Sequence, residues 1–509
     1  MTEQLALLPG YLTAHLQLTL LALFLSTAIS LPLGIAATRV PWLEQPALAI
    51  AGVIQTIPSL ALLAMMVPIL AFLNLQSIGF LPAIVGLTLY GVLPVLRNTV
   101  TGIAGVDPAL KEAACGVGMT PRQQLVRVEL PLAMPVIVAG IRTATVWIVG
   151  IATLSTPVGA TSLGNYIFSG LQTRNYSSVL VGCVAAAVLA LVLDSLVRGI
   201  EFGVQNRRRG HVAASLSLIA LLYVYSGITL AAPLFSEQDR PVVIGSKTFT
   251  EQYILSAMLS RWIEQESGRP TTLMQSLGSN VAFDALDAGD IDVYVDYSGT
   301  LWANEMGRGN VTAPRAEMLS NVDRFLSEEH SVTLAAALGF ENAYAIAVRK
   351  PDATRLGLTT ISDLIPHASR LVLGGDYEFF ARPEWIAVRD TYGLAFRELR
   401  TMDPTLMYQA AAQQDVDVIS AFSSDGRIEA YDLLVLRDNL NAIPPYDAVV
   451  LASARLAKDE PEVLQALARL EGVIDTERMR AMNFSVDEAG ENPDTVAAAF
   501  LSDLSLSSR

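Results

Sequence analysis

The sequence contains little charge, cysteine or histidine for its 509 residues. Charged side chains make up 16% of it and hydrophobic ones 52%, and the mean hydropathy is +0.43. This balance excludes an ordinary soluble enzyme. The two cysteines, Cys115 and Cys183, both lie in the apolar N-terminal part, so the remainder has no disulfide framework. The four histidines show no metal-ligand spacing, and no nucleophile, base and orienting group occur together. We therefore expect a chain that catalyses no reaction and holds no metal or cofactor.

Charge is distributed unevenly along the chain. Residues 1–211 carry 11 basic and 7 acidic side chains, whereas residues 212–509 carry 23 basic and 42 acidic ones. The C-terminal part thus has the composition of an acidic, soluble domain. Such a balance disfavours nucleic acid as a partner, because phosphate binding needs clustered basic residues.

Six apolar runs, each long enough to cross about 30 Å of hydrocarbon, occupy the first 234 residues. The N-terminal "MTEQLALLPG" lacks the basic region of a cleaved export signal, so we expect a polytopic membrane protein. Gln55, Thr56 and Pro58 interrupt the second run, where they either line a cavity or mark a helix kink. Asp194 and Arg198 lie four residues apart in the fifth run and are expected to pair with each other. The runs cover residues 16–37, 48–73, 78–96, 136–158, 179–197 and 212–234.

Basic residues in the connecting loops predict the orientation of these spans. Arg174 alone falls on one side, so the other side is expected to be cytoplasmic. The last span then leads outward, and an acidic domain is tethered outside the cytoplasm. The predicted parts are a transmembrane domain at 1–211, an added transmembrane helix at 212–234, a linker at 235–241 and the outer domain at 242–509. The basic residues assigned to the cytoplasmic side are Arg39, Arg97, Lys111, Arg122, Arg127, Arg198, Arg207, Arg208 and Arg209.

The acidic part alternates short apolar strands with amphipathic helices. "VVIG" at 242–245 precedes a helical pattern, and "IDVYVDYSG", "AYAIAVRK", "RLVLGG", "DVDVISAF" and "LLVLRD" are further strands between helices. This alternation is typical of an α/β domain with its ligand at the carboxyl ends of strands. We expect two lobes, residues 242–341 with 446–509 and residues 342–445, that close on a ligand through a hinge.

Residues 111–131, "KEAACGVGMTPRQQLVRVELP", form a charged interruption between apolar runs. Pro108, with Asp107 as N-cap, predicts a helix start, and Gly116 and Gly118 predict its end. A second helix is expected from Thr120. A helix-turn-helix of this kind suits docking to a partner protein, although an amphipathic loop without a partner has the same pattern.

The loop resembles the "EAA, Gly, Leu-Pro" loop of ABC-type importer permeases. Quaternary-amine (osmoprotectant) ABC importers, some of which fuse permease and binding protein in one chain, are likewise resembled by "GVIQTIPSLALLAMM", "LYGVLPVLRNTVTGI" and the segment from 106 to 146. Ergothioneine importers share that plan. The resemblance covers nearly the whole chain, but "ATLSTPVGATSLGNYIFSGL" stands where the family has a Gly-rich run. The loop residues that carry the likeness are Glu112, Ala113, Ala114, Gly118, Leu130 and Pro131.

This resemblance implies an all-α membrane domain of the type I importer permeases, with about six transmembrane helices, joined to a type II periplasmic-binding-protein-like domain. It also implies a homodimer of permease domains in the lipid of the bacterial cytoplasmic membrane, driven by a separate ATPase chain. "GSKT" at 245–248 lacks the spacing of a phosphate-binding loop, so this chain is not expected to bind ATP.

The outer domain resembles binding proteins for betaine-like ligands through "IGSKTFTEQYIL", "DVYVDYSGTLW", "GFENAYAIAV", "FFARPE" and "PPYDAVV". A trimethylammonium group has no hydrogen-bond donor, so aromatic faces bind it, each contributing about 0.5–2 kcal/mol. A ligand carboxylate needs donors, for which an arginine fork is well suited. The resemblance implies an aromatic cage of Tyr297, Tyr344, Phe422 and Tyr446, and carboxylate partners Lys247, Thr300 and Arg382.

Each of these residues also has a structural interpretation. The rings can pack in a core, Lys247 can be a solvated helix-start lysine, and Arg382 can pair with Glu378 or Glu384. We expect an importer subunit for a betaine-type zwitterion such as glycine betaine, proline betaine or carnitine. Ergothioneine is the alternative cargo, and a ligand-gated receptor or channel is the alternative class. Choline has no carboxylate and would leave Lys247 and Arg382 unpaired, so zwitterions are expected to bind more tightly.

Overall fold

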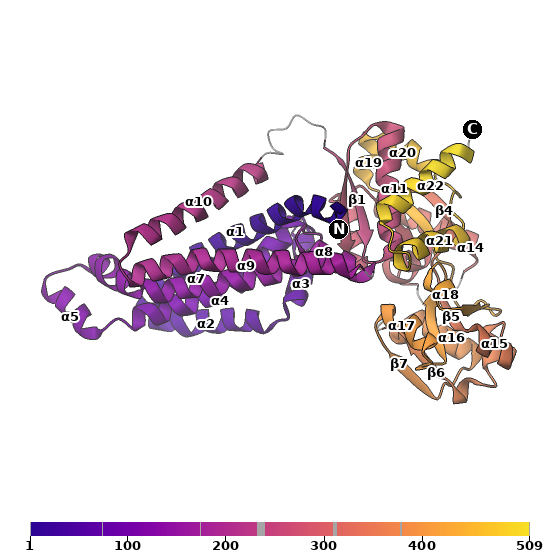
Figure 1. The fold of residues 1–509 in the computed structure, drawn as a ribbon, viewed down its shortest axis with the longest axis horizontal. Helices are drawn as coiled ribbons and strands as arrows, with labels where there is room; N and C mark the ends of the chain where they lie inside the picture. The colour runs from indigo at the N-terminus through magenta and orange to yellow at the C-terminus, as the bar shows by residue number, and fades with distance from the viewer. Residues whose placement is uncertain are drawn as a thin grey trace. The chain divides into compact units, whose positions relative to one another are not determined.

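The computed structural model describes residues 2–73, 75–173, 175–231, 240–308, 313–376 and 379–507. It contains a helical unit, formed mainly by the first 238 residues, and an α/β unit, formed mainly by residues 239–509 (Figure 1). The predicted fold class, a helical membrane part followed by an α/β domain, is confirmed. The expected linker at 235–241 lies largely outside the described residues, as do Arg174 and the end of the sixth apolar run.

Among the described residues, the helical unit contains five single helices that are long and apolar enough to cross a membrane. The second predicted run differs, because it forms two helices bent by 102° at a break next to Pro58. Pro58 has no N–H to continue the helix, and the preceding Ile57 is extended. The kink interpretation therefore applies. The helices of the spans are α1 (Thr2–Arg39), α2 (Pro41–Thr56), α3 (Ser59–Phe72), α4 (Phe80–Ala104), α7 (Leu130–Ala152), α9 (Tyr176–Gln205) and α10 (Arg209–Ala231).

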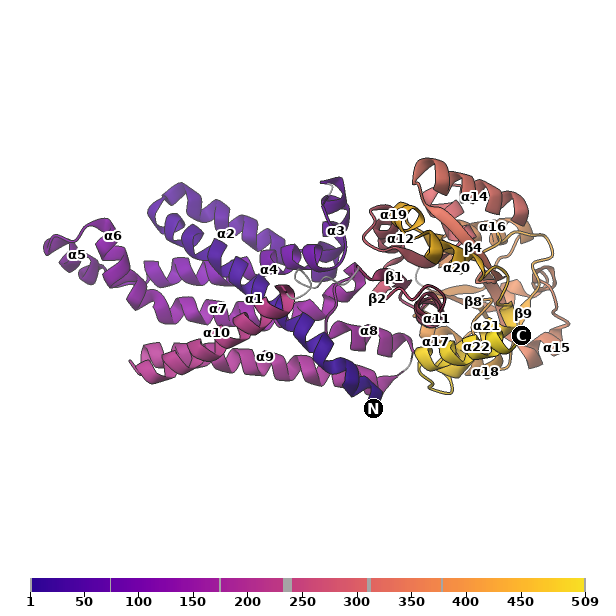
Figure 2. The same ribbon diagram turned by 90° about the horizontal axis from the view of Figure 1, so that it is seen from above.

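The two ends of α7 show which way the other helices run. Arg39, at the end of α1, pairs with Glu129 just before α7 begins. Gly79, just before α4, donates its N–H to the carbonyl of Val158 beyond the other end of α7, at 2.7 Å. The bent pair α2–α3 therefore runs from one end of the unit to the other, and Figure 2 shows α3 far from α5 (Pro108–Gly116). Counted as one broken span, the pair brings the total within the described residues to six.

The last helix of this unit packs against the first. Gln17 donates to Thr229 at 3.0 Å, and the hydroxyls of Thr13 and Tyr225 are 2.8 Å apart. The C-terminal half of α10 therefore lies beside the N-terminal half of α1. The chain leaves the helical unit at the end opposite α5.

The predicted pair between Asp194 and Arg198 is wrong. Asp194 on α9 instead accepts from Arg142 on α7, with Nε to Oδ1 at 2.6 Å and Nη2 to Oδ2 at 3.2 Å. Arg142 also lies 3.5 Å from Glu201. The partner comes from a neighbouring helix because α7 and α9 pack against each other, and spacing along one helix does not reveal such a partner.

The described part of the α/β unit contains two five-stranded sheets. The first has the order β2-β1-β3-β10-β4 and the second the order β7-β6-β8-β5-β9. The chain enters the second sheet after Glu341 and returns to the first at Asp447, so β10 lies between β3 and β4, antiparallel to both. The strands are β1 (Val242–Lys247), β2 (Thr271–Leu277), β3 (Val293–Tyr297), β4 (Thr333–Glu341), β5 (Tyr344–Arg349), β6 (Val372–Gly375), β7 (Glu398–Thr401), β8 (Val418–Phe422), β9 (Leu433–Leu436) and β10 (Asp447–Ala452).

Helices cover both sheets, as the alternating pattern predicts. Every residue of β3 is buried, and its sequence is mainly apolar, with Asp296 as a buried exception that pairs with Lys247. The helix expected after β1 is α11, and its first ten residues are all buried between the first sheet and the helices α20, α21 and α22. The main helices are α11 (Thr250–Ser267), α12 (Ser279–Asp287), α13 (Ser298–Thr300), α14 (Arg315–Glu329), α15 (Lys350–Leu356), α16 (Pro383–Tyr392), α17 (Pro404–Ala412), α18 (Arg427–Ala430), α19 (Ala454–Asp459), α20 (Pro461–Ala468), α21 (Thr476–Asp487) and α22 (Pro493–Ser507).

Candidate ligand-binding site and coupling loop

The loop between α4 and α7 folds as its sequence predicts. The side chain of Asp107 accepts from the Ala109 N–H at 2.9 Å and caps α5, with Pro108 in the first turn. Gly118 follows the end of α5 with φ of +78°, a left-handed conformation that favours glycine. Thr120 and Gln123 form a capping box at the start of α6 (Pro121–Gln124). A π-helical turn, Leu125–Glu129, then leads into α7.

The loop exposes apolar side chains beside its predicted coupling residues. Leu110, Val117 and Val126 are 46%, 75% and 55% exposed. Of the coupling residues, Glu112, Ala113, Gly118 and Pro131 are exposed, Leu130 is half-buried and Ala114 is buried. An apolar surface next to charged groups is the kind that a partner protein covers.

Tyr344 is the centre of an aromatic cluster in the second sheet. It lies directly opposite Phe422 on the neighbouring strand, and the two ring centroids are 4.9 Å apart. The ring centroid of Phe379 lies 5.2 Å from that of Tyr344. The structure thus brings together two of the four predicted cage residues.

Arg382 and Glu384 lie against this cluster. The guanidinium carbon of Arg382 is 5.3 Å from the centroid of the Tyr344 ring. Nε and Nη2 of Arg382 donate to the two oxygens of Glu384, each at 3.1 Å. The Tyr446 hydroxyl donates to the same carboxylate. Arg382, Glu384 and Tyr446 therefore form one hydrogen-bonded group beside Tyr344.

The carboxylate of Glu384 is ionised although it is only 1% exposed. Burial by itself would raise its pKa, but the hydrogen bonds from Arg382, the attraction of its charge and the Tyr446 hydroxyl together lower the pKa below the usual range. Burial and the neighbouring carboxylate raise the pKa of the Tyr446 phenol, which keeps its proton. The Arg382–Glu384 interaction is therefore a true ion pair.

The remaining predicted residues lie around the first sheet. Lys247 is almost completely buried, and its Nζ is 2.5 Å from Asp296 Oδ1. The Tyr297 ring stacks on Phe249 at 6.2 Å, and its hydroxyl donates to Glu251 at 2.5 Å. Thr300 is half-buried on α13. Whether these residues contact ligand stays a prediction.

Glu251 is a functional candidate that sequence reasoning misses. Its buried carboxylate accepts from the Tyr297 hydroxyl, from Asn342 Nδ2 at 3.0 Å and from Asn483 Nδ2 at 3.2 Å. Asn483 also donates to the Ser424 carbonyl. Burial raises the pKa of the Glu251 carboxyl despite these bonds. Because Asn342 lies between the two sheets, Glu251 connects Tyr297 to the hinge. In the sequence, Glu251 looks like an ordinary acidic residue in a first helical turn.

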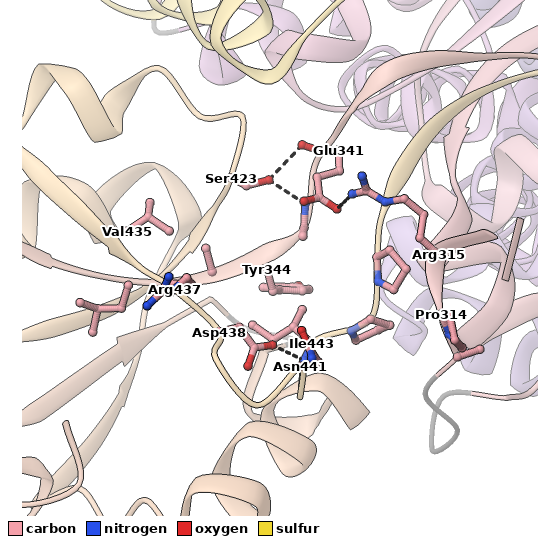
Figure 3. Close-up of a pocket in the computed structure, with 16 residues that line it drawn as sticks. Pro314, Arg315, Glu341, Tyr344, Ser423, Val435, Arg437, Asp438, Asn441 and Ile443 are labelled. Carbon is pink, nitrogen blue, oxygen red and sulfur yellow. Dashed lines mark hydrogen bonds and ion pairs between the residues drawn. The ribbon is translucent and has the colours of Figure 1, made fainter. Parts of the chain in front are cut away.

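A cavity of about 700 Å³ lies where the chain crosses between the sheets (Figure 3). Of the predicted site residues, Tyr344 lines it. Arg315 is held by Glu341 at 2.5 Å and by Asp447 at 3.2 Å, and Asp438 accepts from the Ala442 and Ile443 N–H groups. Two polar side chains of its wall, Arg315 and Asp438, are thus held by ion pairs or by backbone N–H groups of the chain.

Both basic side chains that the sequence predicts for a ligand carboxylate, Lys247 and Arg382, already have acidic partners. Lys247 is neutralised by Asp296, and Arg382 by Glu384. Choline would therefore not leave either cation unpaired, and the expected preference for zwitterions does not follow from unpaired cations.

Comparisons with known proteins divide the chain at the same point as the fold. Residues 30–206 match the inner membrane component of binding-protein-dependent transport systems, and residues 240–503 match the substrate-binding domain of ABC-type glycine betaine transport systems. The Helicobacter pylori ergothioneine transport permease/ergothioneine binding protein EgtU is 30% identical over 472 residues, which cover 90% of this chain and 83% of that protein. It spans both matched parts.

Two further relatives each match one part. The choline transport system permease protein OpuBB of Bacillus subtilis is 45% identical over 180 residues, which are 35% of this chain and 80% of that protein. The carnitine transport binding protein OpuCC of Listeria monocytogenes is 30% identical over 294 residues, which are 56% of this chain and 95% of that protein.

Proposed function

This chain belongs to the ABC importers that fuse a membrane permease to a substrate-binding domain of the glycine betaine type, and from that premise we propose that it imports a betaine-type quaternary ammonium compound. The α/β unit captures the ligand between its lobes, and the helical unit conducts it through the membrane. No covalent chemistry is required of this chain.

The observation that carries this proposal is the position of the Arg382 guanidinium, which is a cation, near the Tyr344 ring. The Arg382 guanidinium lies 5.3 Å from that ring, which Phe422 and Phe379 flank. A cluster of aromatic rings that accepts one cation offers the quadrupole field that a trimethylammonium group needs. Tyr446, within hydrogen-bonding distance of the neighbouring Glu384, belongs to the same site.

The loop containing Glu112 and Gly118 is proposed to dock on a separate ATPase chain. Its exposed apolar side chains and its rigidly capped helices support this role. The ion pair between Arg39 and the buried Glu129 joins α1 to the start of α7, so a push on the loop reaches two spans. Two copies of the helical unit are proposed to enclose the transport path in the cytoplasmic membrane.

The position of the end of α10 supports an extracytoplasmic location for the α/β unit. α10 ends at the end of the helical unit opposite α5. If the docking loop is cytoplasmic, as its basic neighbours predict, the α/β unit is attached on the extracytoplasmic side. Tethering then keeps the captured ligand at an effective concentration of about millimolar near the transport path.

The names of the relatives point to more than one cargo within this class. The fused relative is named for ergothioneine, and the relatives of single parts are named for choline and carnitine. All of these compounds carry a trimethylammonium group. Ergothioneine is the second candidate cargo, because the relative named for it has the same fused plan across 90% of this chain.

Uptake into vesicles prepared from the organism's own membranes tests the proposal. Labelled glycine betaine, carnitine, ergothioneine and choline are offered with and without ATP. Accumulation of at least one compound that requires both ATP and this chain supports an importer. Entry that needs this chain but not ATP supports the ligand-gated channel instead.

A further inference from the structure

Glu251 is a buried acid whose hydrogen-bonding partners are all neutral. It is 2% exposed and lies in the first turn of α11. One oxygen, Oε1, accepts from the Tyr297 hydroxyl at 2.5 Å and from Asn342 Nδ2 at 3.0 Å. The other oxygen, Oε2, accepts from Asn483 Nδ2 at 3.2 Å. A carboxyl group whose two oxygens only accept has the hydrogen-bonding pattern of an ionised carboxylate.

Within the part of the chain that the structure describes, this carboxylate has no basic partner. Lys247, which lies beside the Tyr297 ring, is paired with Asp296 instead. Burial raises the pKa of the Glu251 carboxyl, and its neutral hydrogen-bond donors oppose that increase. Because a buried negative charge is costly without a positive one, a cation brought close to Glu251 is stabilised.

Tyr297 connects this carboxylate to the predicted cage. Its ring belongs to the same buried cluster as Tyr446, and the Lys247 ammonium lies 5.8 Å from the ring centroid. Burial and the charge of Glu251 raise the pKa of the Tyr297 phenol, so the hydroxyl keeps its proton and donates it to the carboxylate. A phenol polarised in this way has more negative charge on its ring, which strengthens the attraction of the ring for a cation.

We propose that Glu251 is a positioning residue for the ligand cation: through the Tyr297 ring, its carboxylate supplies the negative charge that a quaternary ammonium group neutralises. This inference rests on the proposed function, because it assumes a quaternary ammonium ligand bound against Tyr297. It assigns to Glu251 the preference for a charged ligand head over an uncharged head of the same shape.

The contacts of Glu251 also permit a purely structural role. Asn342 lies at the first crossing between the sheets, and Asn483 donates to the carbonyl of Ser424, beyond β8, at 2.8 Å. A structural role would change the binding of charged and uncharged ligands by the same factor. An electrostatic role changes chiefly the binding of the charged ligand, so the two roles are separable by measurement.

The test compares each quaternary ammonium compound with the analogue in which a tert-butyl group replaces the trimethylammonium group. For glycine betaine this analogue is 3,3-dimethylbutanoate, and for choline it is 3,3-dimethylbutanol; carnitine and ergothioneine are altered in the same way. Binding to the purified full chain is measured at pH 8, where carboxyl groups are ionised more fully than at neutral pH. Weakly binding analogues are measured by displacement of the bound quaternary compound. The measured quantity is the Kd of the analogue divided by the Kd of the quaternary compound.

Glu251→Gln keeps the size of the side chain and an oxygen for the Tyr297 hydroxyl, but removes the charge. We expect the Kd ratio to fall about tenfold in this variant, through weaker binding of the quaternary compound. Glu251→Asp keeps the charge and is expected to hold the ratio within about threefold of the wild type. Glu264→Gln is the matched control, because it removes an exposed acidic charge from the same helix.

A change in Tyr297 provides an independent test of the same link. Tyr297→Phe keeps a ring but removes the hydroxyl that donates to Glu251. We expect the Kd ratio to fall about threefold, because the ring is no longer polarised by the carboxylate. A ratio equal to that of the wild type would show that the ring acts without Glu251.

The outcomes separate this inference from the function beneath it. If the wild type binds none of the quaternary ammonium compounds, the proposed function is wrong and this inference fails with it. If the wild type binds one and Glu251→Gln leaves the Kd ratio unchanged, Glu251 has a structural role and only this inference is overturned. If Glu251→Gln fails to fold, the ratio for Tyr297→Phe decides, and an unchanged ratio there overturns the inference.

Discussion

The Nζ atom of Lys247 lies 2.5 Å from Oδ1 of Asp296, and both side chains are at most 3% exposed. The other oxygen of Asp296 accepts from the Tyr294 hydroxyl, also at 2.5 Å. This buried network of Lys247, Asp296 and Tyr294 lies in the interior of the first sheet.

Replacing Lys247 is expected to destabilise the domain more than it changes ligand selection. Lys247→Met leaves the buried Asp296 carboxylate unpaired, which costs about 3–5 kcal/mol. The double variant Lys247→Met/Asp296→Asn is expected to recover much of that loss, since it removes both charges. Thermal unfolding of the purified chain measures both effects.

Ligand binding to the same double variant separates the two roles of Lys247. The measured quantity is the Kd for the methyl ester of glycine betaine divided by the Kd for glycine betaine itself. We expect this ratio to stay within about twofold of the wild type, because the Lys247 ammonium is already paired with Asp296. A selective loss of zwitterion binding would instead establish Lys247 as the carboxylate partner that the resemblance implies.

Gly299 is expected to tolerate no side chain. A Cβ atom there would lie 2.7 Å from three carbons of the Tyr446 ring, closer than real Cβ contacts. Gly299→Ala must therefore displace Tyr446 from the Glu384 carboxylate and from the proposed cage. We expect ligand affinity to fall about tenfold, which corresponds to the loss of one aromatic or hydrogen-bonding contact. Gly210→Ala, where a Cβ meets nothing within 4 Å, is the control.

Two glycines of the docking loop allow a matched test of its conformation. A Cβ would meet nothing within 4 Å at either Gly116 or Gly118, but only Gly118 has a left-handed backbone, with φ of +78°. Gly118→Ala therefore costs about 1–2 kcal/mol of backbone strain, whereas Gly116→Ala costs little. We expect Gly118→Ala to reduce uptake severalfold with unchanged ligand affinity, and Gly116→Ala to keep both. Equal uptake in the two variants would contradict the docking role.

Asp487 is expected to make stability depend on pH. Burial raises the pKa of this carboxyl to about 6; Arg427 opposes the increase, Asp425 and Glu488 add to it, and the Thr250 hydroxyl donates to it at 2.6 Å. Because the folded pKa exceeds the unfolded value of about 3.9, folding favours the protonated acid. The resulting stability is complete below about pH 4 and is lost as the pH rises through about 6.

Asp487→Asn removes this titration. Relative to the wild type, the variant is expected to gain stability as the pH rises from 4 to 7, by about 3 kcal/mol at most. Unfolding midpoints measured across that range provide the test. Glu477→Gln, which changes an exposed acid on the same helix, should track the wild type at every pH. A constant difference between Asp487→Asn and the wild type would show that the carboxylate does not titrate there.

Local signals in the sequence are sufficient for much of this fold. Asp107 and Pro108 start α5, Thr120 starts α6, and Pro58 breaks the second span, because caps and proline act through neighbouring backbone groups. The alternation of strands and helices predicts the α/β unit, since burial on both faces of strands such as β5 leaves a nearly continuous apolar run.

Long-range partners are what the sequence does not reveal. Asp194 pairs with Arg142, 52 residues away, rather than with Arg198. Lys247 pairs with Asp296, 49 residues away. The sequence around a charged residue does not identify its partner, because the partner depends on which helices and strands pack together. The sequence therefore marks Arg382 as a cation in a ligand motif, while the role of Glu384 emerges only from its contacts with Arg382 and Tyr446.

Equilibrium binding to the full chain tests the central claim most directly. Trimethylammonium compounds, namely glycine betaine, carnitine, ergothioneine and choline, are titrated beside their tertiary-amine counterparts, such as dimethylglycine for glycine betaine. We predict that at least one trimethylammonium compound binds, and that its tertiary counterpart binds at least about tenfold more weakly, because its N–H donor is left unsatisfied against aromatic faces. Equal binding of the tertiary amine, or no binding of any trimethylammonium compound, would contradict the account.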